Sequence, residues 1–277
     1  MRILHVTDAV ALMRPSHWVK NLLVFAPVFF GGALGEAGKI GGAAAACGAF
    51  CLVAGGGYAL NDAADARENA LHPEKRNRPL ARGRITRRQA ILLGCAAMGA
   101  GIAIAAAGSP EAVPVIGLYA LLSAAYSAFA KRIPIVEMMF FPAFYLARIF
   151  AGGLAADIAV SRWLILCVIF MSMFLITVKR GAEHGRGGYP REFLASMMPV
   201  FAAAALMSYG LYCVLAARSP QAIYSIFFPI AGVMRYVALA AEGRAGGNPE
   251  RTVVRDPFMA GTVIVWAIWM HVLIYGV

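Results

Sequence analysis

Residues 58–83, YALNDAADARENALHPEKRNRPLARG, place two aspartates, several amide side chains and then a run of cations between two apolar stretches. Each of these apolar stretches approaches the roughly twenty residues that a helix needs to cross the core of a bilayer. Charged groups at a membrane boundary are costly unless they are compensated, and they are therefore often functional. We interpret the segment as a loop between two membrane helices and as the first candidate site.

The composition around this segment is that of an integral membrane protein. Of the 277 residues, 61% are hydrophobic and only 14% are charged, and the mean hydropathy is +0.70. Soluble domains usually carry about a quarter of their residues as charged side chains. We therefore predict an all-α protein that forms one transmembrane domain over residues 1–277. Its five cysteines all lie inside apolar segments, which predicts no disulfide framework.

Nine apolar segments have the length of a membrane-spanning helix. They cover approximately 17–36, 40–61, 88–107, 112–130, 134–154, 161–179, 193–216, 220–241 and 257–276. Lysine and arginine gather in every second loop, and such loops stay in the cytoplasm. This pattern predicts a multi-pass protein of the cytoplasmic (inner) membrane with its N-terminus in the cytoplasm and its C-terminus outside. This topology explains most of the net charge of +11, and an anionic substrate would explain the remaining excess, so we expect no nucleic-acid partner.

The acidic residues of the opening segment have helical spacing. Asp62, Asp65 and Asn69 are separated by three and four residues, which places them on one face of a helix. Two carboxylates with amide oxygens suit Mg²⁺, which completes its shell with phosphate and water. We predict that Asp62 and Asp65 are catalytic and hold the metal together with Asn69, and that Asn61 contacts the substrate. The alternative is a solvated helix end with ion pairs to nearby cations.

Three cations follow the acidic group within ten residues of Asn69: Lys75, Arg76 and Arg78. Arginine presents a planar fork that fits phosphate, and lysine acts as a point charge. Alone, such a run is explained by membrane topology. Beside a magnesium site, we interpret these three residues as ligands of a diphosphate.

The stretch from 61 to 83 resembles the first motif of the UbiA-type intramembrane prenyltransferase superfamily, in which an Asn-Asp pair precedes further acids at helical spacing. Here Asn69 stands in place of the last acid, which leaves the number of metal ions open. Further stretches resemble, in the same order, the decaprenyl-phosphate phosphoribosyltransferase branch of that superfamily. They are residues 13–32, 126–153, 174–184 and 233–257.

The resemblance implies nine membrane helices around a polar cavity open to the cytoplasm. It also implies a magnesium-dependent transfer of 5-phosphoribosyl from phosphoribosyl pyrophosphate to a polyprenyl (decaprenyl) phosphate. The products would be 5-phosphoribosyl-1-phosphoryl polyprenol and pyrophosphate. The lipid product would serve as a precursor of cell-wall arabinan, as in arabinogalactan, or of related glycolipids.

The second half of the chain is poor in acids at the place where prenyltransferases of this superfamily carry a second acidic motif. Glu137 is retained there, and the next acid is Asp157. Cations are present instead, which favours an acceptor monophosphate over a second metal-bound diphosphate. The further candidates for substrate binding are Lys20, Tyr126, Lys131, Arg148, Lys179 and Arg180.

Each of these candidates has an alternative interpretation. Arg148 lies in the middle of a span, where an arginine is costly unless it faces a cavity or a partner, and a structural pair with Glu137 is the alternative. The others lie near the ends of spans, where tyrosine and cationic side chains commonly act as interface anchors.

Two other functions remain open from the sequence. One is a prenyltransferase that joins a prenyl diphosphate to an aromatic acceptor of the 4-hydroxybenzoate type. The other is a transporter that uses the acidic cluster as an ion site, although such sites usually lie near the bilayer midplane on broken helices. The sequence also leaves open a homo-oligomer and the length of the polyprenol.

Overall fold

The structure is a computed structural model that describes residues 5–71, 75–183, 188–245 and 249–276, and all regular elements in these ranges are helices. Eight helices in the described ranges are long and apolar enough to cross a membrane. They are Ala37–Ala64, Arg87–Gly108, Pro110–Ala128, Val136–Ala155, Arg162–Ala182, Arg191–Leu215, Pro220–Ala241 and Pro257–Tyr275. The predicted all-α fold is confirmed, and eight of the nine predicted spans coincide with these helices.

The first predicted span, 17–36, is not one continuous α-helix. A 3₁₀-helix, η1 (Pro15–Phe25), leads into the short α2 (Ala26–Phe30). Pro27 lacks a backbone donor close to the point where η1 gives way to α2. The chain then turns at Gly32, whose φ of +73° favours glycine. The length of an apolar segment does not indicate such interruptions. The count of nine spans stays a prediction.

The chain divides into two compact units, which are described separately. Unit 1 comprises Met1–Val28, Ala33–Phe129 and Ala147–Ala159, and unit 2 comprises Phe29–Gly32, Ala130–Leu146 and Val160–Val277. Neither unit is a continuous piece of sequence, and α7 (Val136–Ala155) contributes residues to both. The predicted single domain over residues 1–277 stays a prediction.

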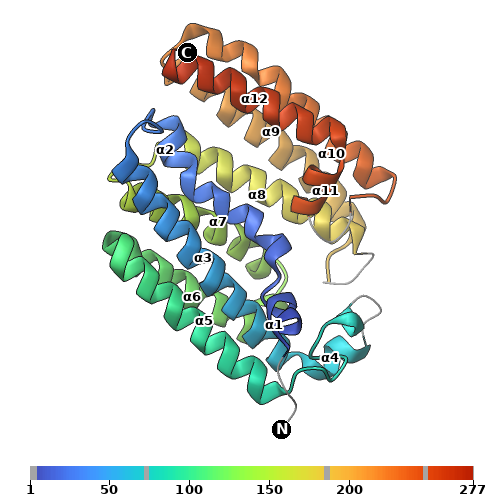
Figure 1. The fold of residues 1–277 in the computed structure, drawn as a ribbon. Helices are drawn as coiled ribbons and strands as arrows, with labels where there is room; N and C mark the ends of the chain where they lie inside the picture. The colour runs from blue at the N-terminus through green and yellow to red at the C-terminus, as the bar shows by residue number, and fades with distance from the viewer. Residues whose placement is uncertain (1–4, 72–74, 184–187, 246–248, 277) are drawn as a thin grey trace. The chain divides into compact units, whose positions relative to one another are not determined.

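Unit 1 is organised around α3 (Ala37–Ala64) and α5 (Arg87–Gly108), which lie side by side, with α6 (Val113–Ala128) next to them (Figure 1). Small residues line the contact between α3 and α5. A Cβ atom on Gly94 would lie 3.0 Å from the backbone oxygen of Gly56, which shows how closely the two backbones approach. The contact packs the C-terminal half of α3 closely against α5.

The connection from α3 to α5 carries the acidic and cationic residues of the opening segment. It contains α4 (Ala66–Leu71) and the 3₁₀ turn η2 (Lys75–Asn77). Thr86 then begins α5 with a capping box, because its side chain accepts from the Gln89 N–H at 3.2 Å while Gln89 Oε1 accepts from the Thr86 N–H at 2.9 Å. Buried Ile85 packs in a cluster with Leu12 of α1 (Val6–Met13), which anchors the end of the connection.

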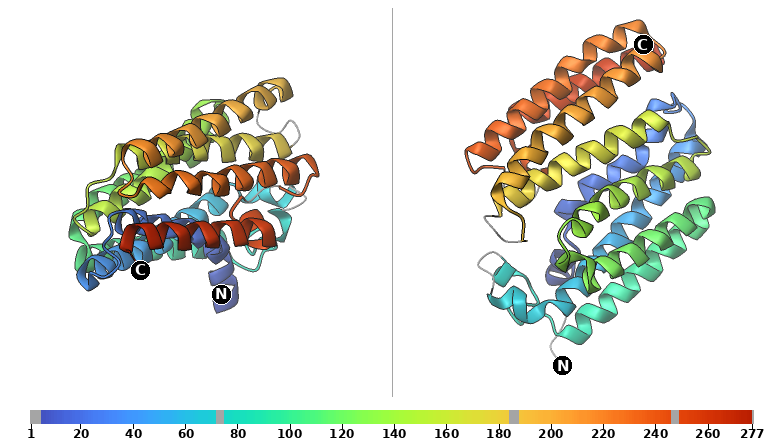
Figure 2. Two further views of the ribbon diagram at one scale, coloured as in Figure 1. Left: turned by 90° about the horizontal axis from the view of Figure 1, so that it is seen from above. Right: turned by 180° about the vertical axis from the view of Figure 1, so that it is seen from behind.

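Unit 2 contains four long helices that run beside one another in both views of Figure 2 and in Figure 1. They are α8 (Arg162–Ala182), α9 (Arg191–Leu215), α10 (Phe227–Ala241) and α12 (Pro257–Tyr275). Phe174, Tyr236, Leu239 and Met259 form part of their common core.

Short helical elements connect the long helices of the two units. η3 (Pro110–Ala112) lies before α6, and η4 (Ala130–Arg132) lies before α7. The remaining elements are η5 (Pro220–Ile226) and α11 (Pro249–Arg255).

Candidate active site

Asp62 lies in the last turn of α3, and only 1% of the residue is exposed. Arg14 Nη2 and Arg78 Nη1 donate to its Oδ1 atom at 2.6 and 2.8 Å. Asn69 Nδ2 donates to the same oxygen at 3.4 Å, while Asn69 Oδ1 accepts from Arg78 Nη1 at 3.2 Å. Two guanidinium groups and an amide therefore compensate the buried carboxylate, as burial of a charge requires.

The helix that carries Asp62 is interrupted at Asp65. α3 ends at Ala64, Asp65 has φ −95° and ψ 19°, and α4 begins at the next residue. Hydrogen bonds of helical type still cross this junction, because the Asp65 N–H donates to the Asn61 carbonyl at 2.9 Å and the Asn69 N–H to the Asp65 carbonyl at 2.8 Å. The prediction that Asp62, Asp65 and Asn69 lie on one continuous helix is therefore wrong. Asp62 and Asn69 nevertheless contact each other.

Arg14 was not among the predicted site residues, and it reaches Asp62 from a distant part of the sequence. It lies between α1 and η1 with a φ of +51°, a region that residues other than glycine seldom adopt. Its Cζ atom lies 4.8 Å from the centroid of the Tyr58 ring, and Lys20 Nζ lies 5.5 Å from the same centroid. Tyr58 therefore gathers two cations near the carboxylate. The sequence signal that marks this place is Pro15, because helices usually end before a proline.

The predicted cations of the opening segment have different environments. Burial, followed by repulsion from Arg14, lowers the pKa of the Arg78 guanidinium, and the Asp62 carboxylate opposes this shift. Arg78 remains charged at neutral pH because an arginine does not lose its proton in a protein. Arg76 is exposed on η2. The side chain of Lys75 lies outside the described residues, so its predicted role stays a prediction.

Oxygen acceptors at the end of α3 fit a magnesium ion. Beside the carboxylate of Asp62 and the amide of Asn69, the buried Asn61 Oδ1 atom has no hydrogen-bond partner among the described residues. An unpaired buried acceptor is costly, and a bound ligand would satisfy it. No three His, Cys, Asp or Glu side chains in the described ranges group as metal ligands. An ion here would therefore use amide oxygens, water and phosphate, as Mg²⁺ commonly does.

Arg148 of α7 is buried, with 1% of the residue exposed. Its Nε atom donates to Asn21 Oδ1 at 2.8 Å and its Nη2 atom to the Tyr119 hydroxyl at 3.3 Å. Its Cζ atom lies 4.8 and 5.3 Å from the ring centroids of Tyr119 and Phe50. Polar and aromatic groups thus compensate an arginine within a span. These contacts favour a positioning role, and direct substrate contact by Arg148 stays a prediction.

Unit 2 holds a second polar cluster at the end of α8. Arg180 forms ion pairs with Glu137 of α7 and with Glu183. The Tyr189 hydroxyl lies 3.4 Å from Glu137 Oε2. The buried Nε atom of Arg180 has no hydrogen-bond partner among the described residues. The cluster therefore combines two carboxylates with a guanidinium donor that a ligand oxygen can satisfy.

The remaining predicted residues are placed but not linked to a ligand. Lys179 Nζ lies 5.5 Å from the centroid of the Phe141 ring. Lys131 lies on η4, Tyr126 lies near the end of α6, and both are half-buried. Their substrate contacts, and that of Lys20, stay predictions.

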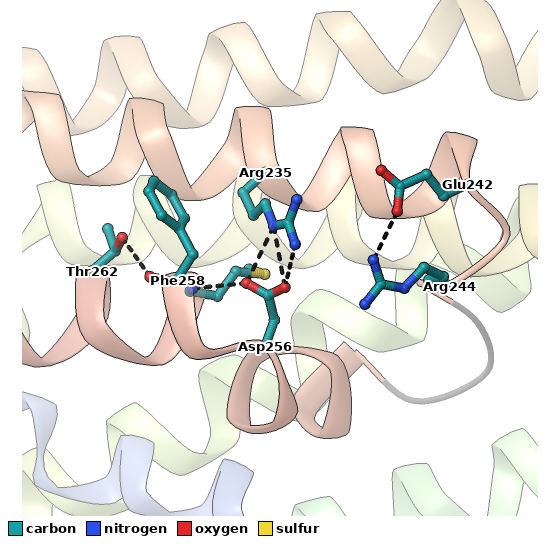
Figure 3. Close-up of polar contacts among 7 residues, drawn as sticks. Arg235, Glu242, Arg244, Asp256, Phe258 and Thr262 are labelled. Carbon is teal, nitrogen blue, oxygen red and sulfur yellow. Dashed lines mark hydrogen bonds and ion pairs between the residues drawn. The ribbon is translucent and has the colours of Figure 1, made fainter.

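An ion pair that was not predicted joins α10 to the start of α12 (Figure 3). Arg235 Nη2 donates to Asp256 Oδ2 at 2.6 Å, and Arg235 Nε lies 3.1 Å from the same oxygen. Asp256 Oδ1 also accepts from the Met259 N–H at 3.0 Å, so Asp256 is the N-cap of α12. The available sequence signal was an aspartate directly before Pro257, since this pair is typical of a helix start.

The chain belongs to the UbiA prenyltransferase family, whose sequence model matches residues 24–240. Solved structures agree at the level of the fold. A UbiA homolog from Archaeoglobus fulgidus bound to GPP and Mg²⁺ aligns with a TM-score of 0.76 and 17% identity, over 98% of this chain and 100% of that chain. A UbiA homolog from Aeropyrum pernix K1 aligns with a TM-score of 0.63 and 19% identity, over 95% and 99%.

Within this family, the chain is similar to curated decaprenyl-phosphate phosphoribosyltransferases. The protein from Corynebacterium glutamicum is 32% identical over 95% of this chain and 85% of the relative. The protein from Mycobacterium tuberculosis strain H37Rv is 29% identical over 94% of this chain and 92% of the relative. The predicted resemblance to this branch of the family is confirmed.

Proposed function

We propose that this protein transfers 5-phosphoribosyl from phosphoribosyl pyrophosphate to a polyprenyl phosphate in a magnesium-dependent reaction. The observation that carries the proposal is the buried Asp62 carboxylate, held by Arg14 and Arg78 beside the unpaired Asn61 oxygen. Acidic and cationic groups side by side suit a metal-bound diphosphate. The names of the curated relatives, which match nearly the whole chain, support the identity of the two substrates.

The donor diphosphate would bind at the end of α3. Asp62, Asp65 and Asn69 would hold Mg²⁺, which when bound supplies positive charge to the leaving pyrophosphate. Arg78 already contacts Asp62, and Lys75 and Arg76 lie in the same connection between α3 and α5. Their task is to neutralise the charge that develops on the pyrophosphate as it leaves.

The chemistry that these residues support is a substitution at C1 of the ribose. The bond from C1 to the pyrophosphate oxygen breaks, and the pyrophosphate leaves with the bonding electron pair. The ring gains oxocarbenium character, as at other glycosyl centres. An oxygen of the polyprenyl phosphate supplies the electron pair of the new bond from the opposite face, which inverts the configuration. No general base is needed, because a phosphate monoester with a second pKa of about 6 is already anionic at neutral pH.

The acceptor phosphate would bind to cations of the second polar cluster. Both carboxylates of this cluster, Glu137 and Glu183, are ion-paired with Arg180, which favours a monophosphate ligand over a second metal-bound diphosphate. The Nε atom of Arg180 offers a buried donor for a phosphate oxygen. Lys179 and Lys131 are further candidates. We assign Lys20 and Tyr126 to substrate contact in unit 1. Arg148 supports Asn21 and remains a candidate for substrate contact.

The cellular setting of the reaction is also part of the proposal. The N-terminus would lie in the cytoplasm and the C-terminus outside, with a polar cavity open to the cytoplasm in the inner membrane. Phosphoribosyl pyrophosphate is a soluble anion, so a donor site on the cytoplasmic side would have access to it. The lipid product would enter the synthesis of arabinan or of a related glycolipid.

One alternative function has a specific observation in its favour. The fold is shared with a UbiA homolog whose structure was solved with GPP and Mg²⁺, and GPP is a prenyl diphosphate. A prenyl transfer to an aromatic acceptor would use the site at Asp62 for a different diphosphate. It would not need phosphoribosyl pyrophosphate.

A transfer assay on the purified protein in lipid or detergent tests the proposal. It contains labelled phosphoribosyl pyrophosphate, a polyprenyl phosphate and Mg²⁺, with and without a chelator. We expect chelator-sensitive label in the lipid phase together with released pyrophosphate. An unlabelled lipid phase with several polyprenol lengths, and a prenylated aromatic acid in a parallel reaction, would overturn the proposal in favour of the alternative. A product with retained configuration at C1 would overturn the inversion.

A further inference from the structure

Asp62 has two cationic partners, Arg14 and Arg78. Arg14 Nη2 and Arg78 Nη1 both donate to Oδ1, the oxygen that also accepts from Asn69. A carboxylate has about four lone-pair positions, two on each oxygen, so three donors crowd this one atom. A divalent ion that binds at Oδ1 must displace at least one of these donors.

The two arginines differ in the contacts that they make besides Asp62. Arg78 has a second partner in the site, because its Nη1 atom also lies 3.2 Å from Asn69 Oδ1. The carboxylate partner of Arg14 is Asp62, and Arg14 lies at the junction of α1 and η1 with a φ of +51°. An unfavourable backbone conformation that the fold maintains is often found where a side chain has a function. Arg78 would lose a contact with Asn69 as well, so we take Arg14, whose other contact is the Tyr58 ring, as the donor that a metal displaces.

A guanidinium of Arg14 that leaves Asp62 can remain in contact with the Tyr58 ring. The guanidinium lies 4.8 Å from the Tyr58 ring centroid, and the ring face attracts a cation without using Asp62. Lys20 approaches the same ring at 5.5 Å. The guanidinium therefore stays next to the metal site when it leaves the carboxylate, where it can bind a phosphate with its planar fork.

We propose that Arg14 is the resident counter-ion of Asp62, which the metal displaces onto the diphosphate of the donor. Arg14 then opposes a metal ion that arrives alone and favours a metal ion that arrives with a diphosphate. The site would thereby favour the metal–diphosphate complex over the metal ion alone. This inference rests on the proposed function for the identity of the donor, but its effect on metal binding does not.

The experiment is a titration of the purified full-length chain with Mn²⁺, followed by electron paramagnetic resonance, with and without inorganic pyrophosphate. For Arg14→Gln we expect Mn²⁺ alone to bind about tenfold more tightly, the factor that one charge-assisted hydrogen bond is worth. With pyrophosphate present, we expect the same variant to bind about tenfold more weakly than the parent protein.

Arg82→Gln is the matched control, because it removes the same charge from an exposed side chain that hydrogen-bonds Asn77 at 2.6 Å. We expect it to leave both affinities unchanged, which separates local displacement from the loss of net charge. Asp62→Asn should abolish the binding of Mn²⁺, so that the spectrum of the free ion remains, and this result assigns the binding to this site. The thermal unfolding temperature of each variant verifies that it is folded.

The opposite signs are the decisive result. Equal Mn²⁺ affinity for the parent and Arg14→Gln, weaker binding of Mn²⁺ alone, or no binding to either protein would overturn the inference. The Mn²⁺ titration needs no donor substrate. A failed transfer assay with a positive titration would therefore reject the donor assignment and retain the counter-ion role of Arg14.

Discussion

Asp62 is the least exposed acidic residue that the structure describes, with 1% of the residue exposed. Its partners Arg14 and Arg78 lie 48 and 16 residues away in the sequence. Removing one partner of a buried ion pair leaves an uncompensated charge, which costs more than the pair contributes. Asp62 therefore links stability and metal binding at one atom, and a substitution must separate the two effects.

Asp62→Asn keeps the shape and an acceptor oxygen but removes the charge. We expect transfer of phosphoribosyl to fall by at least about a hundredfold, the order of magnitude of the loss of a group that stabilises developing charge. The measurement is initial rate in the transfer assay at saturating Mg²⁺, with the unfolding temperature measured in parallel. A folded variant that retains the activity of the parent would refute the metal role of Asp62.

A second single residue, Asp256, controls a helix start. The hydrogen bonds from Arg235 and then from the Met259 N–H hold the pKa of the Asp256 carboxyl below its usual value (Figure 3). A carboxyl whose pKa is lower in the folded state stabilises that state above its unfolded pKa of about 3.9. This stabilisation is lost as the pH falls through the lower, folded value.

Asp256→Asn tests this dependence, because asparagine retains the N-cap and loses the charge. We expect a lower unfolding temperature than the parent at pH of about 7 and a smaller difference at pH of about 3. Glu242→Gln is the control, since its pair with Arg244 is exposed and contributes little. A difference between parent and Asp256→Asn that does not change with pH would contradict the ionic role.

At the scale of the element, close backbone approaches decide which helices can pack. Gly152 of α7 and Val24 of η1 both belong to unit 1, and a Cβ on Gly152 would lie 1.8 Å from the Val24 carbonyl oxygen. No side chain fits in this space, so the glycine allows η1 to lie against α7. The same contact places Asn21 within reach of Arg148.

We expect Gly152→Ala to destabilise the protein by about 1–3 kcal/mol, the usual cost of overpacking. Gly117→Ala is the matched control within α6, because a Cβ there meets no atom within 4 Å. That control should be neutral or stabilise by up to about 1 kcal/mol through helix propensity. The unfolding temperature of both variants in the same detergent is the measurement. An unchanged value for Gly152→Ala would show that the approach of η1 to α7 is looser than the structure has it.

The elements were largely predictable, because apolar length is a local property of the sequence. Eight predicted spans coincide with helices, and the start of α5 carries a local capping signal in Thr86 and Gln89. The 3₁₀ conformation of η1 and the interruption at Asp65 were not predicted. The segment of η1 is as apolar as a membrane helix, and the polar residues around Asp65 have helical spacing. The conformation of both segments depends on contacts with other elements.

At the scale of the whole molecule, the distribution of cations predicts the orientation in the membrane. The span Pro220–Ala241 has exposed Gln221 near one end and exposed Arg244 beyond the other. The proposed topology puts Gln221 outside and Arg244 in the cytoplasm.

Gln221→Cys and Arg244→Cys test this orientation with a membrane-impermeant maleimide on intact cells. We expect label on the first variant and none on the second until the membrane is permeabilised. The parent chain, with its five native cysteines, supplies the background. The reverse pattern would invert the topology and place the donor site on the wrong side for a cytoplasmic substrate.

The residue sequence was sufficient for the class of protein, the approximate limits of its spans and the acidic segment after the second span. These follow from composition, apolar length and helical spacing, which neighbours along the chain determine. The partners of the polar groups came only from the tertiary structure. Arg14 meets Asp62 across 48 residues, Arg180 meets Glu137 across 43, and Arg148 meets Asn21 across 127. A buried charge must find its compensation wherever the packed helices bring it, and no local pattern records which residue that will be.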